Sequence, residues 1–289
     1  MIYRRRASAL HAARAAAGGA YCAALAVCAL AFQHPLVLAA VIVAAVGAGI
    51  GAGVTRELAA AAKVGLPLAL LVALVNPFVV RDGLTVFFRL GEVPPFGQVD
   101  LTVEALVYGV LLGARVLAVV LCCALFAAAV DPDETLRVFR RVSFRSALTA
   151  ALAVRLVPVL ARDARRMADA NACRAVAGAA PGRVTVLRAV ATSALDRAVD
   201  VAATLEVRGY GSRAAVRRGS EPWSRHDLAF GGAAVLLIAF VLGARVTGVA
   251  DLVAYPSLHA PLGPAEIGLS MAIVTVALLP FADRRGIER

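Results

Sequence analysis

Six long apolar stretches alternate with polar segments along the 289 residues of the chain. A bilayer core of about 30 Å needs about 20 residues of helix, so apolar runs of about 18 residues or more predict membrane-spanning helices. The six predicted spans cover residues 15–32, 36–54, 64–80, 101–130, 228–247 and 265–281. The pattern therefore predicts an all-α fold, a polytopic membrane helical bundle of about six spans.

The longest polar segment, residues 131–227, separates the fourth predicted span from the fifth. Asp131-Pro132-Asp133-Glu134 offers a capping residue, a proline at the first helical position and an acidic first turn, which predicts a short helix over 132–142. A longer helix is expected over 144–176, bent at Pro158, and an amphipathic helix over 183–208 that stops at Gly209. We therefore divide the chain into three parts: four spans in 1–130, a helical segment outside the bilayer in 131–227, and two spans in 228–289.

The composition supports a membrane protein, and the distribution of charge predicts its orientation in the bilayer. Hydrophobic residues make up 61% of the chain and charged residues 17%, and the net charge is +11. The segment 131–227 holds 17 of the 30 Lys and Arg residues. If both termini are cytoplasmic, the cytoplasmic segments hold 26 of those 30, which agrees with the positive-inside rule. We expect a multi-pass protein of the cell (inner or cytoplasmic) membrane, surrounded by lipid, with N- and C-termini and the segment 131–227 in the cytoplasm.

Nucleic acid is not an expected partner, despite the positive charge. The chain has one lysine, Lys63, and it lacks both a stripe of aromatic side chains and a nucleic-acid-binding fold signature. The charge is concentrated in one segment between spans, which suggests a protein partner on the cytoplasmic side.

The second predicted span ends in a glycine-rich run, Gly47-Ala48-Gly49-Ile50-Gly51-Ala52-Gly53. The run superficially matches a dinucleotide-binding fingerprint, but that fingerprint needs a βαβ unit, and here it ends a membrane run. Glycines four residues apart instead let membrane helices approach closely. We interpret these glycines, and Gly109 and Gly113 in the fourth span, as helix-packing positions.

Sequence motifs for catalysis and cofactors are missing. There is no Gly-Lys-Ser/Thr phosphate-binding loop, so the chain is not expected to hydrolyse ATP itself. The five cysteines lack the spacing of a metal or redox site, and four of them lie inside predicted spans, where a thiol behaves as a small apolar group. We expect a non-catalytic protein without a cofactor, a metal site or a disulfide.

Two alternative functions, and the role of one charged residue inside a predicted span, stay open at this point. Asp196 and Asp200 are paired carboxylates of the kind with which a magnesium-dependent membrane transferase could hold a lipid diphosphate, although a solvated helix face is the ordinary explanation. A carrier that transports alone is the other alternative. Arg115 lies in the middle of the fourth span, and its cost of about 2.5–3.5 kcal/mol on insertion scales predicts that it faces protein rather than lipid.

The order of features in the chain resembles one known family. The motifs that carry the resemblance are His34-Pro35, Leu74-Val75-Asn76, Arg155-Leu156-Val157-Pro158, Asp163-Ala164-Arg165-Arg166-Met167, Ala172-Cys173-Arg174-Ala175 and Leu205-Glu206-Val207-Arg208-Gly209-Tyr210. Over residues 30–213 the chain resembles the transmembrane T component of energy-coupling-factor (ECF) ABC importers, the cobalt-transport membrane subunit family. The last motif is very close to the family's Leu/Met-Glu-Ala-Arg-Gly-Tyr/Phe signature.

The resemblance implies a coupling subunit that passes motions of two ABC-type ATPases to a separate substrate-binding membrane S component. It implies uptake of a vitamin or a transition-metal ion and leaves the substrate open, because the S component selects it. The implied ATPase-coupling residues are Cys173, Arg174 and Ala175 at the end of one helix and Val207, Arg208 and Gly209 at the end of the next. The first motif departs from the usual Ala-Arg-Gly or Ala-Arg-Ser, and the second has Val207 where alanine is usual.

Overall fold

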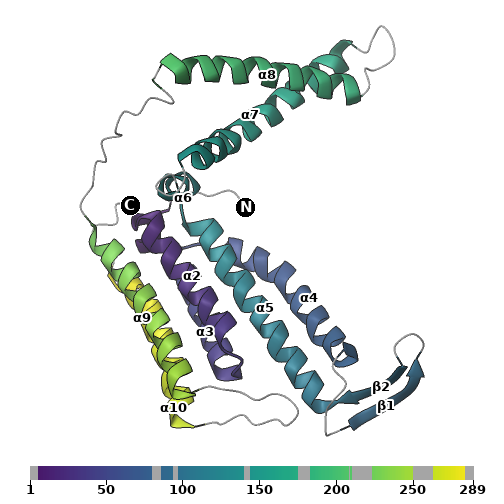
Figure 1. Cartoon of the computed structure of the whole chain (residues 1–289), viewed down its shortest axis with the longest axis vertical. Coiled ribbons are helices and arrows are strands. Elements are labelled where there is room, and N and C mark those ends of the chain that lie inside the picture. The colour runs from purple at the N-terminus through teal and green to yellow at the C-terminus, as the bar shows by residue number, and fades with distance from the viewer. Residues whose placement is uncertain are drawn as a thin grey trace. The chain divides into compact units, whose positions relative to one another are not determined.

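The structure is a computed structural model that describes residues 6–79, 86–93, 97–139, 144–174, 183–207, 209, 223–249 and 263–283 (Figure 1). In chain order its elements are α1 (Ala9–Ala12), α2 (Ala15–Ala31), α3 (Pro35–Gly51), α4 (Thr55–Val79), β1 (Val86–Val93), β2 (Gly97–Thr102), α5 (Val103–Ala129), α6 (Pro132–Phe139), α7 (Phe144–Arg174), α8 (Arg183–Val207), α9 (Arg225–Thr247), α10 (Pro264–Leu278) and the 3-10 turn η2 (Leu279–Phe281).

Each of the six predicted spans corresponds to an apolar helix. Among the residues that the structure describes, four stretches are long and apolar enough to cross a membrane: α4, α5, α9, and α10 together with η2. The helices α2 and α3 are shorter, with 17 residues each, which corresponds to about 25 Å of helix. The predicted all-α polytopic membrane helical bundle is confirmed for the spans, and the described residues add one β-hairpin to it.

A β-hairpin between α4 and α5 was not predicted from the sequence. Strands β1 and β2 pair in antiparallel fashion, from Val86 opposite Thr102 to Val93 opposite Gly97. The register shifts twice along β1, once after Val86 and once after Arg89. Such irregularities break the alternation of inward and outward side chains by which a strand is recognised in a sequence.

Two compact units make up the chain. The first, which we call the membrane bundle, comprises residues 1–138 and 223–289, and the second comprises residues 139–222. We call α7 and α8 of the second unit the two-helix unit. The helix α6 falls largely in the first unit, and the division of the chain at 131 and 227 stays a prediction.

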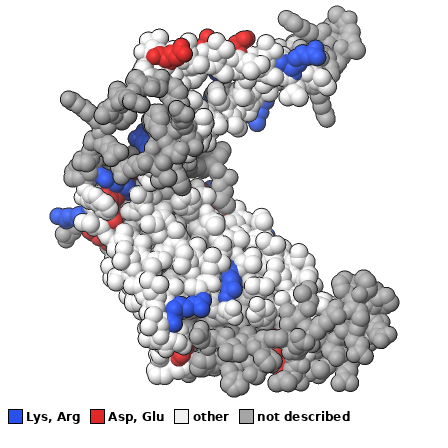
Figure 2. Space-filling model, viewed as in Figure 1, with Lys and Arg blue, Asp and Glu red and all other residues white. Residues whose placement is uncertain are grey.

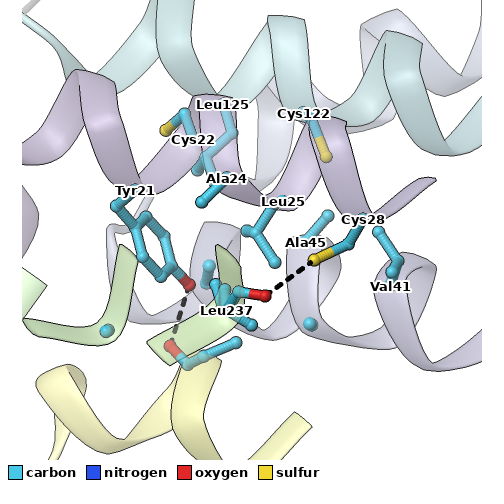
Figure 3. Packing of buried hydrophobic residues seen from close by; sticks show 14 of the residues in the cluster. Tyr21, Cys22, Ala24, Leu25, Cys28, Val41, Ala45, Cys122, Leu125 and Leu237 are labelled. Atoms are coloured by element: carbon cyan, nitrogen blue, oxygen red, sulfur yellow. Dashed lines mark hydrogen bonds between the residues drawn. The ribbon is translucent and has the colours of Figure 1, made fainter. Parts of the chain in front are cut away.

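The helix α2 lies at the centre of the membrane bundle and contacts α5 and α9. Tyr21, Leu25 and Cys28 on α2 are completely buried. The Tyr21 hydroxyl donates a hydrogen bond to the Ala277 carbonyl of α10 at 2.8 Å (Figure 3). The Tyr21 ring also meets the Phe230 ring of α9 edge-on, with ring centroids 5.3 Å apart. These contacts join α2 to two helices, α9 and α10, that are distant from it in the sequence.

Glycines in α5 allow α4 to pack closely against it. A Cβ atom added at Gly113 would lie 2.5 Å from the Ala69 carbonyl oxygen, and one at Gly109 would lie 2.7 Å from that of Ala73. Neither carbonyl can move without moving the α4 backbone. The interpretation of Gly109 and Gly113 as helix-packing positions is therefore confirmed.

Two arginines from neighbouring helices cap the C-terminal end of α2. Arg115 of α5 donates to the Phe32 carbonyl at 3.0 Å, and Arg245 of α9 donates to the Ala31 carbonyl at 2.6 Å. The last carbonyls of a helix lack partners within it and carry partial negative charge, so guanidinium groups stabilise them. Arg115 is half-buried, which agrees with the prediction that it faces protein.

An aspartate fixes the start of α9, where the chain returns to the membrane bundle. Ser224 caps α9 and forms a reciprocal capping box with Asp227. Asp227 is 1% exposed; it also accepts from the backbone N–H of Arg14 at 2.7 Å and lies 3.3 Å from the Arg14 guanidinium. This junction ties the start of α9 to the start of α2.

Candidate functional site

The helices α7 and α8 contact one another and cross (Figure 1). Where they meet, the Nη1 atom of Arg197 on α8 lies 3.3 Å from the Oδ2 atom of Asp163 on α7. The side chain of Asp163 is 18% exposed and that of Arg197 is 38% exposed. The facing side of α8 also has the half-buried residues Val190, Ala194 and Val201. An ion pair and a narrow apolar strip therefore hold the crossing.

The first predicted coupling motif lies at the C-terminal end of α7. Cys173 is exposed, and Arg174 is the last residue of the helix. Ala175 lies outside the described residues. At 31 residues α7 is about 46 Å long, so its end lies far from its start. Pro158, where a bend was predicted, lies inside the helix, and its carbonyl accepts from the Arg162 side chain at 3.2 Å.

The second predicted coupling motif lies at the C-terminal end of α8. Val207 is the last residue of the helix and is 88% exposed. Arg208 lies outside the described residues. Gly209 has φ of +77° and donates its backbone N–H to the Glu206 carbonyl at 2.8 Å. A left-handed glycine of this kind terminates a helix, so the predicted stop at Gly209 is confirmed.

A second face of α8 exposes large apolar side chains. Val184, Leu187, Leu195 and Val199 are between 68% and 74% exposed. At 100° per residue they fall within about a third of the helix circumference, beside the face that meets α7. On α7, Val154 and Val157 are also at least half exposed. We call the four α8 residues the α8 apolar stripe; exposed apolar patches of this kind mark contact surfaces for proteins or membranes.

Asp196 and Asp200, the carboxylates of the transferase alternative, are exposed on α8. Figure 2 shows acidic groups along the upper edge of this helix. Among the described residues there is no group of three or more His, Cys, Asp and Glu side chains placed to hold a metal ion. Arg197, which lies beside Asp196 in the sequence, pairs with Asp163 on the neighbouring helix.

Sequence reasoning missed the ion pair that joins α7 to α8. Asp163 was singled out only as part of a motif, and Arg197 lies in the sequence beside the paired carboxylate Asp196. The two residues are 34 positions apart, and so are Arg174 and Arg208. That equal spacing is a signal in the sequence, but it has a meaning only once the two helices are known to cross.

One of the comparisons with known proteins identifies a family for the chain. A search of curated proteins finds no match. The model of the CbiQ family, described as cobalt transport protein, matches residues 8–217, which is most of the chain and includes α2 to α8. The chain therefore belongs to the CbiQ cobalt transport protein family, the T components of energy-coupling-factor transporters, and is a transmembrane component of such a transport system.

Proposed function

We propose that the chain is the non-catalytic coupling subunit of an ECF-type importer. Two ABC-type ATPases bind at the ends of α7 and α8, and a separate membrane S component binds the substrate, a transition-metal ion or a vitamin. One observation carries the proposal: the chain belongs to the cobalt transport protein family, and it has two long helices that cross. Each of these helices ends at the position of a motif arginine.

The positions of the two helix ends suit two partner subunits. Beyond the crossing, the C-terminal parts of α7 and α8 run in opposite directions (Figure 1). Arg174 lies eleven residues beyond Asp163, and Val207 ten residues beyond Arg197. At 1.5 Å per residue each end is about 15–16 Å from the crossing, so the two ends are held well apart. Two separate grooves on an ATPase pair can receive them.

The chemistry of the motifs also suits docking. A guanidinium presents a fixed fork of donors that binds a carboxylate with two parallel hydrogen bonds. Gly209, and Ala172 and Ala175 in the first motif, add little bulk around the arginine positions. Small neighbours let the backbone of a partner approach closely, so that an arginine can reach into a groove.

The α8 apolar stripe supports the proposal that a membrane-embedded partner binds to this chain. Leu195 and Val199 are 68% and 69% exposed on a helix that carries exposed aspartates on another side. Covering such side chains removes apolar surface from water, at about 25 cal/mol for each Å². A hydrophobic S component therefore gains binding energy on this face, and the acidic side of α8 stays in water.

In this mechanism, closure of the ATPase pair on ATP brings the ends of α7 and α8 to a new separation. Because helices are stiff, displacement of an end is carried along its length rather than absorbed within it. The apolar stripe moves with the helix, and the S component resting on it tilts between outward and inward access. ATP is hydrolysed in the ATPases, and this chain transmits the motion with N- and C-termini in the cytoplasm.

The test is reconstitution of the purified chain with its ATPases in lipid vesicles. Arg208→Glu is expected to abolish association with the ATPases and stimulation of their hydrolysis, because it places a carboxylate where the groove accepts a cation. Arg174→Glu is also expected to weaken association with the ATPases, and the double variant is expected to associate more weakly than either single variant. Arg188→Glu is the matched control, since Arg188 is exposed on α8 outside both motifs.

Wild-type association by the Arg208→Glu variant would overturn the proposal. Uptake by the chain alone without ATP would favour a stand-alone carrier instead. Loss of activity in Asp196→Asn with Asp200→Asn, with the ATPases unaffected, would favour the lipid-diphosphate transferase. Mass spectrometry of whatever co-purifies in mild detergent identifies the S component and, through it, the substrate.

A further inference from the structure

The ion pair between Asp163 and Arg197 lies at the same sequence distance from both motif arginines. Arg174 follows Asp163 by eleven residues, and Arg208 follows Arg197 by eleven residues. Eleven residues are close to three full helical turns, or about 16 Å along an α-helix. The contact between α7 and α8 therefore lies eleven residues before each motif arginine in the sequence, and the described helices extend beyond it by eleven residues in α7 and by ten in α8.

We propose that the Asp163–Arg197 ion pair is the fulcrum of an equal-armed lever: it sets the angle at which α7 and α8 cross, and hence the separation of the two arginine positions. This inference rests on the proposed function for its consequence in transport. The geometry itself, a pinned crossing with equal arms, is a property of the chain alone.

Charge and burial both favour a positioning role for this pair. The two side chains come from different helices, and their oxygen and nitrogen atoms lie 3.3 Å apart with the carboxylate 18% exposed. Around them the facing side of α8 has short or branched apolar residues, Val190, Ala194 and Val201, and apolar contact is by itself non-directional. The ion pair adds an attraction between opposite charges at one point on each helix, which the apolar strip lacks.

Equal arms have a mechanical consequence. A rotation of 10° about the fulcrum moves each motif position by about 3 Å, since each arm is about 16 Å long. Both positions move by the same amount, so two ATPases that close symmetrically do equal work on the two helices. A fulcrum displaced by one turn would make one arm about a third longer and the two displacements unequal.

A distance measurement on the purified full-length chain tests the fulcrum directly. The N-terminal arm of α7 and the C-terminal arm of α8 lie on the same side of the crossing (Figure 1), so their separation reports the crossing angle. Spin labels are placed at Val154→Cys and Val207→Cys, which are 50% and 88% exposed. The two exposed native thiols, Cys123 and Cys173, are replaced by alanine.

The labelled arms are about 14 Å long, so a change of 10° in the crossing angle moves the labels apart by about 2 Å. Asp163→Asn and Arg197→Gln are each expected to broaden or shift the distance distribution by at least this much. The charge swap, Asp163→Arg with Arg197→Asp, is expected to restore the narrow distribution. Asp169→Asn, an exposed aspartate on the same helix, is the control and leaves it unchanged.

The thermal midpoint separates positioning from simple stability. Partly exposed ion pairs contribute little to folding, so the single variants keep the wild-type midpoint while their distances change. Two outcomes overturn the inference. If the label-to-label distances of the single variants equal those of the wild type, packing alone sets the crossing angle. If the distance distribution of the charge-swap variant is as broad as those of the single variants, the angle depends on the two residues but not on their charges.

The transport consequence is measured separately as substrate taken up per ATP hydrolysed in reconstituted vesicles. Asp163→Asn is expected to lower this ratio while the ATPases still bind, and the charge swap is expected to recover it. An unchanged ratio in Asp163→Asn overturns the role in transport. If instead Arg208→Glu leaves ATPase binding intact, the proposed function fails while the distance result for the fulcrum still stands.

Discussion

The membrane bundle and the two-helix unit differ in what fills the space between their helices. In the bundle, Tyr21 and Leu25 are completely buried, and glycines bring α4 and α5 into backbone contact. In the two-helix unit, large apolar residues such as Leu195 remain exposed, and an ion pair marks the crossing. Close packing resists deformation, whereas a crossing with few contacts can change its angle. We infer that the bundle is a fixed frame and that, in the proposed function, the two-helix unit is the part that moves when its partners bind.

If the bundle is the fixed frame, its buried polar junction should carry the largest stability effect. Asp227→Ala removes a carboxylate that accepts from Ser224 and from Arg14, and it leaves the Arg14 guanidinium without this partner. The expected loss is about 3 kcal/mol in the free energy of unfolding. Denaturant unfolding in detergent micelles measures it. Asp200→Ala, an exposed aspartate on α8, serves as the control and should change little.

The glycine contact between α4 and α5 offers the next effect. Gly113→Ala places a methyl group 2.5 Å from the Ala69 carbonyl oxygen, so one helix must shift. Overpacking of this kind costs about 1–3 kcal/mol. Gly232→Ala is the matched control, because an added Cβ there meets nothing within 4 Å. Equal stability of the two variants by thermal unfolding would show that α4 and α5 are not tightly packed.

The movable part should respond in binding rather than in stability. Leu187→Gln with Leu195→Gln changes two exposed residues of the α8 apolar stripe, so the free energy of unfolding should stay within about 0.5 kcal/mol of wild type. Affinity for the membrane partner should fall about tenfold or more, because apolar contact area is lost. Titration of the labelled partner in nanodiscs measures this. Asp196→Asn is the control on the other side of α8.

The smallest effect is expected at the rim of the bundle. Arg245 is exposed and donates to the Ala31 carbonyl at the end of α2. Arg245→Gln removes a charge from that helix end and should lower the unfolding free energy by about 0.3–1 kcal/mol. High salt should reduce the difference in unfolding free energy between the wild type and Arg245→Gln, since the contact is open to solvent. A loss as large as that of Asp227→Ala would contradict this ranking.

The sequence was sufficient for the features that depend on local pattern. Hydropathy alone located the six apolar helices, and the glycine after Arg208 located the end of α8, because a left-handed residue stops a helix wherever it occurs. The glycine spacing in α5 predicted close packing in the same way. The motif arginines were recognised through a family resemblance, and the family match over residues 8–217 supports it.

Features that depend on which distant segments meet were not predicted. The pairing of Asp163 with Arg197 requires α7 and α8 to cross at one place, and the capping of α2 by Arg115 and Arg245 requires α5 and α9 to flank it. The β-hairpin was missed because its register shifts hide the alternation of a strand. In each case the sequence holds the residues, and their partners are set by tertiary packing.

The central claim, that the ends of α7 and α8 dock onto ATPases, is tested most directly by photocrosslinking. A photoreactive phenylalanine replaces Val207, which is 88% exposed beside Arg208; a second protein carries it at Val235, exposed on α9. In vesicles with all subunits, illumination should join position 207 to an ATPase subunit and position 235 to lipid or a membrane protein. An assembled, ATP-hydrolysing complex in which position 207 never crosslinks to an ATPase would contradict the account.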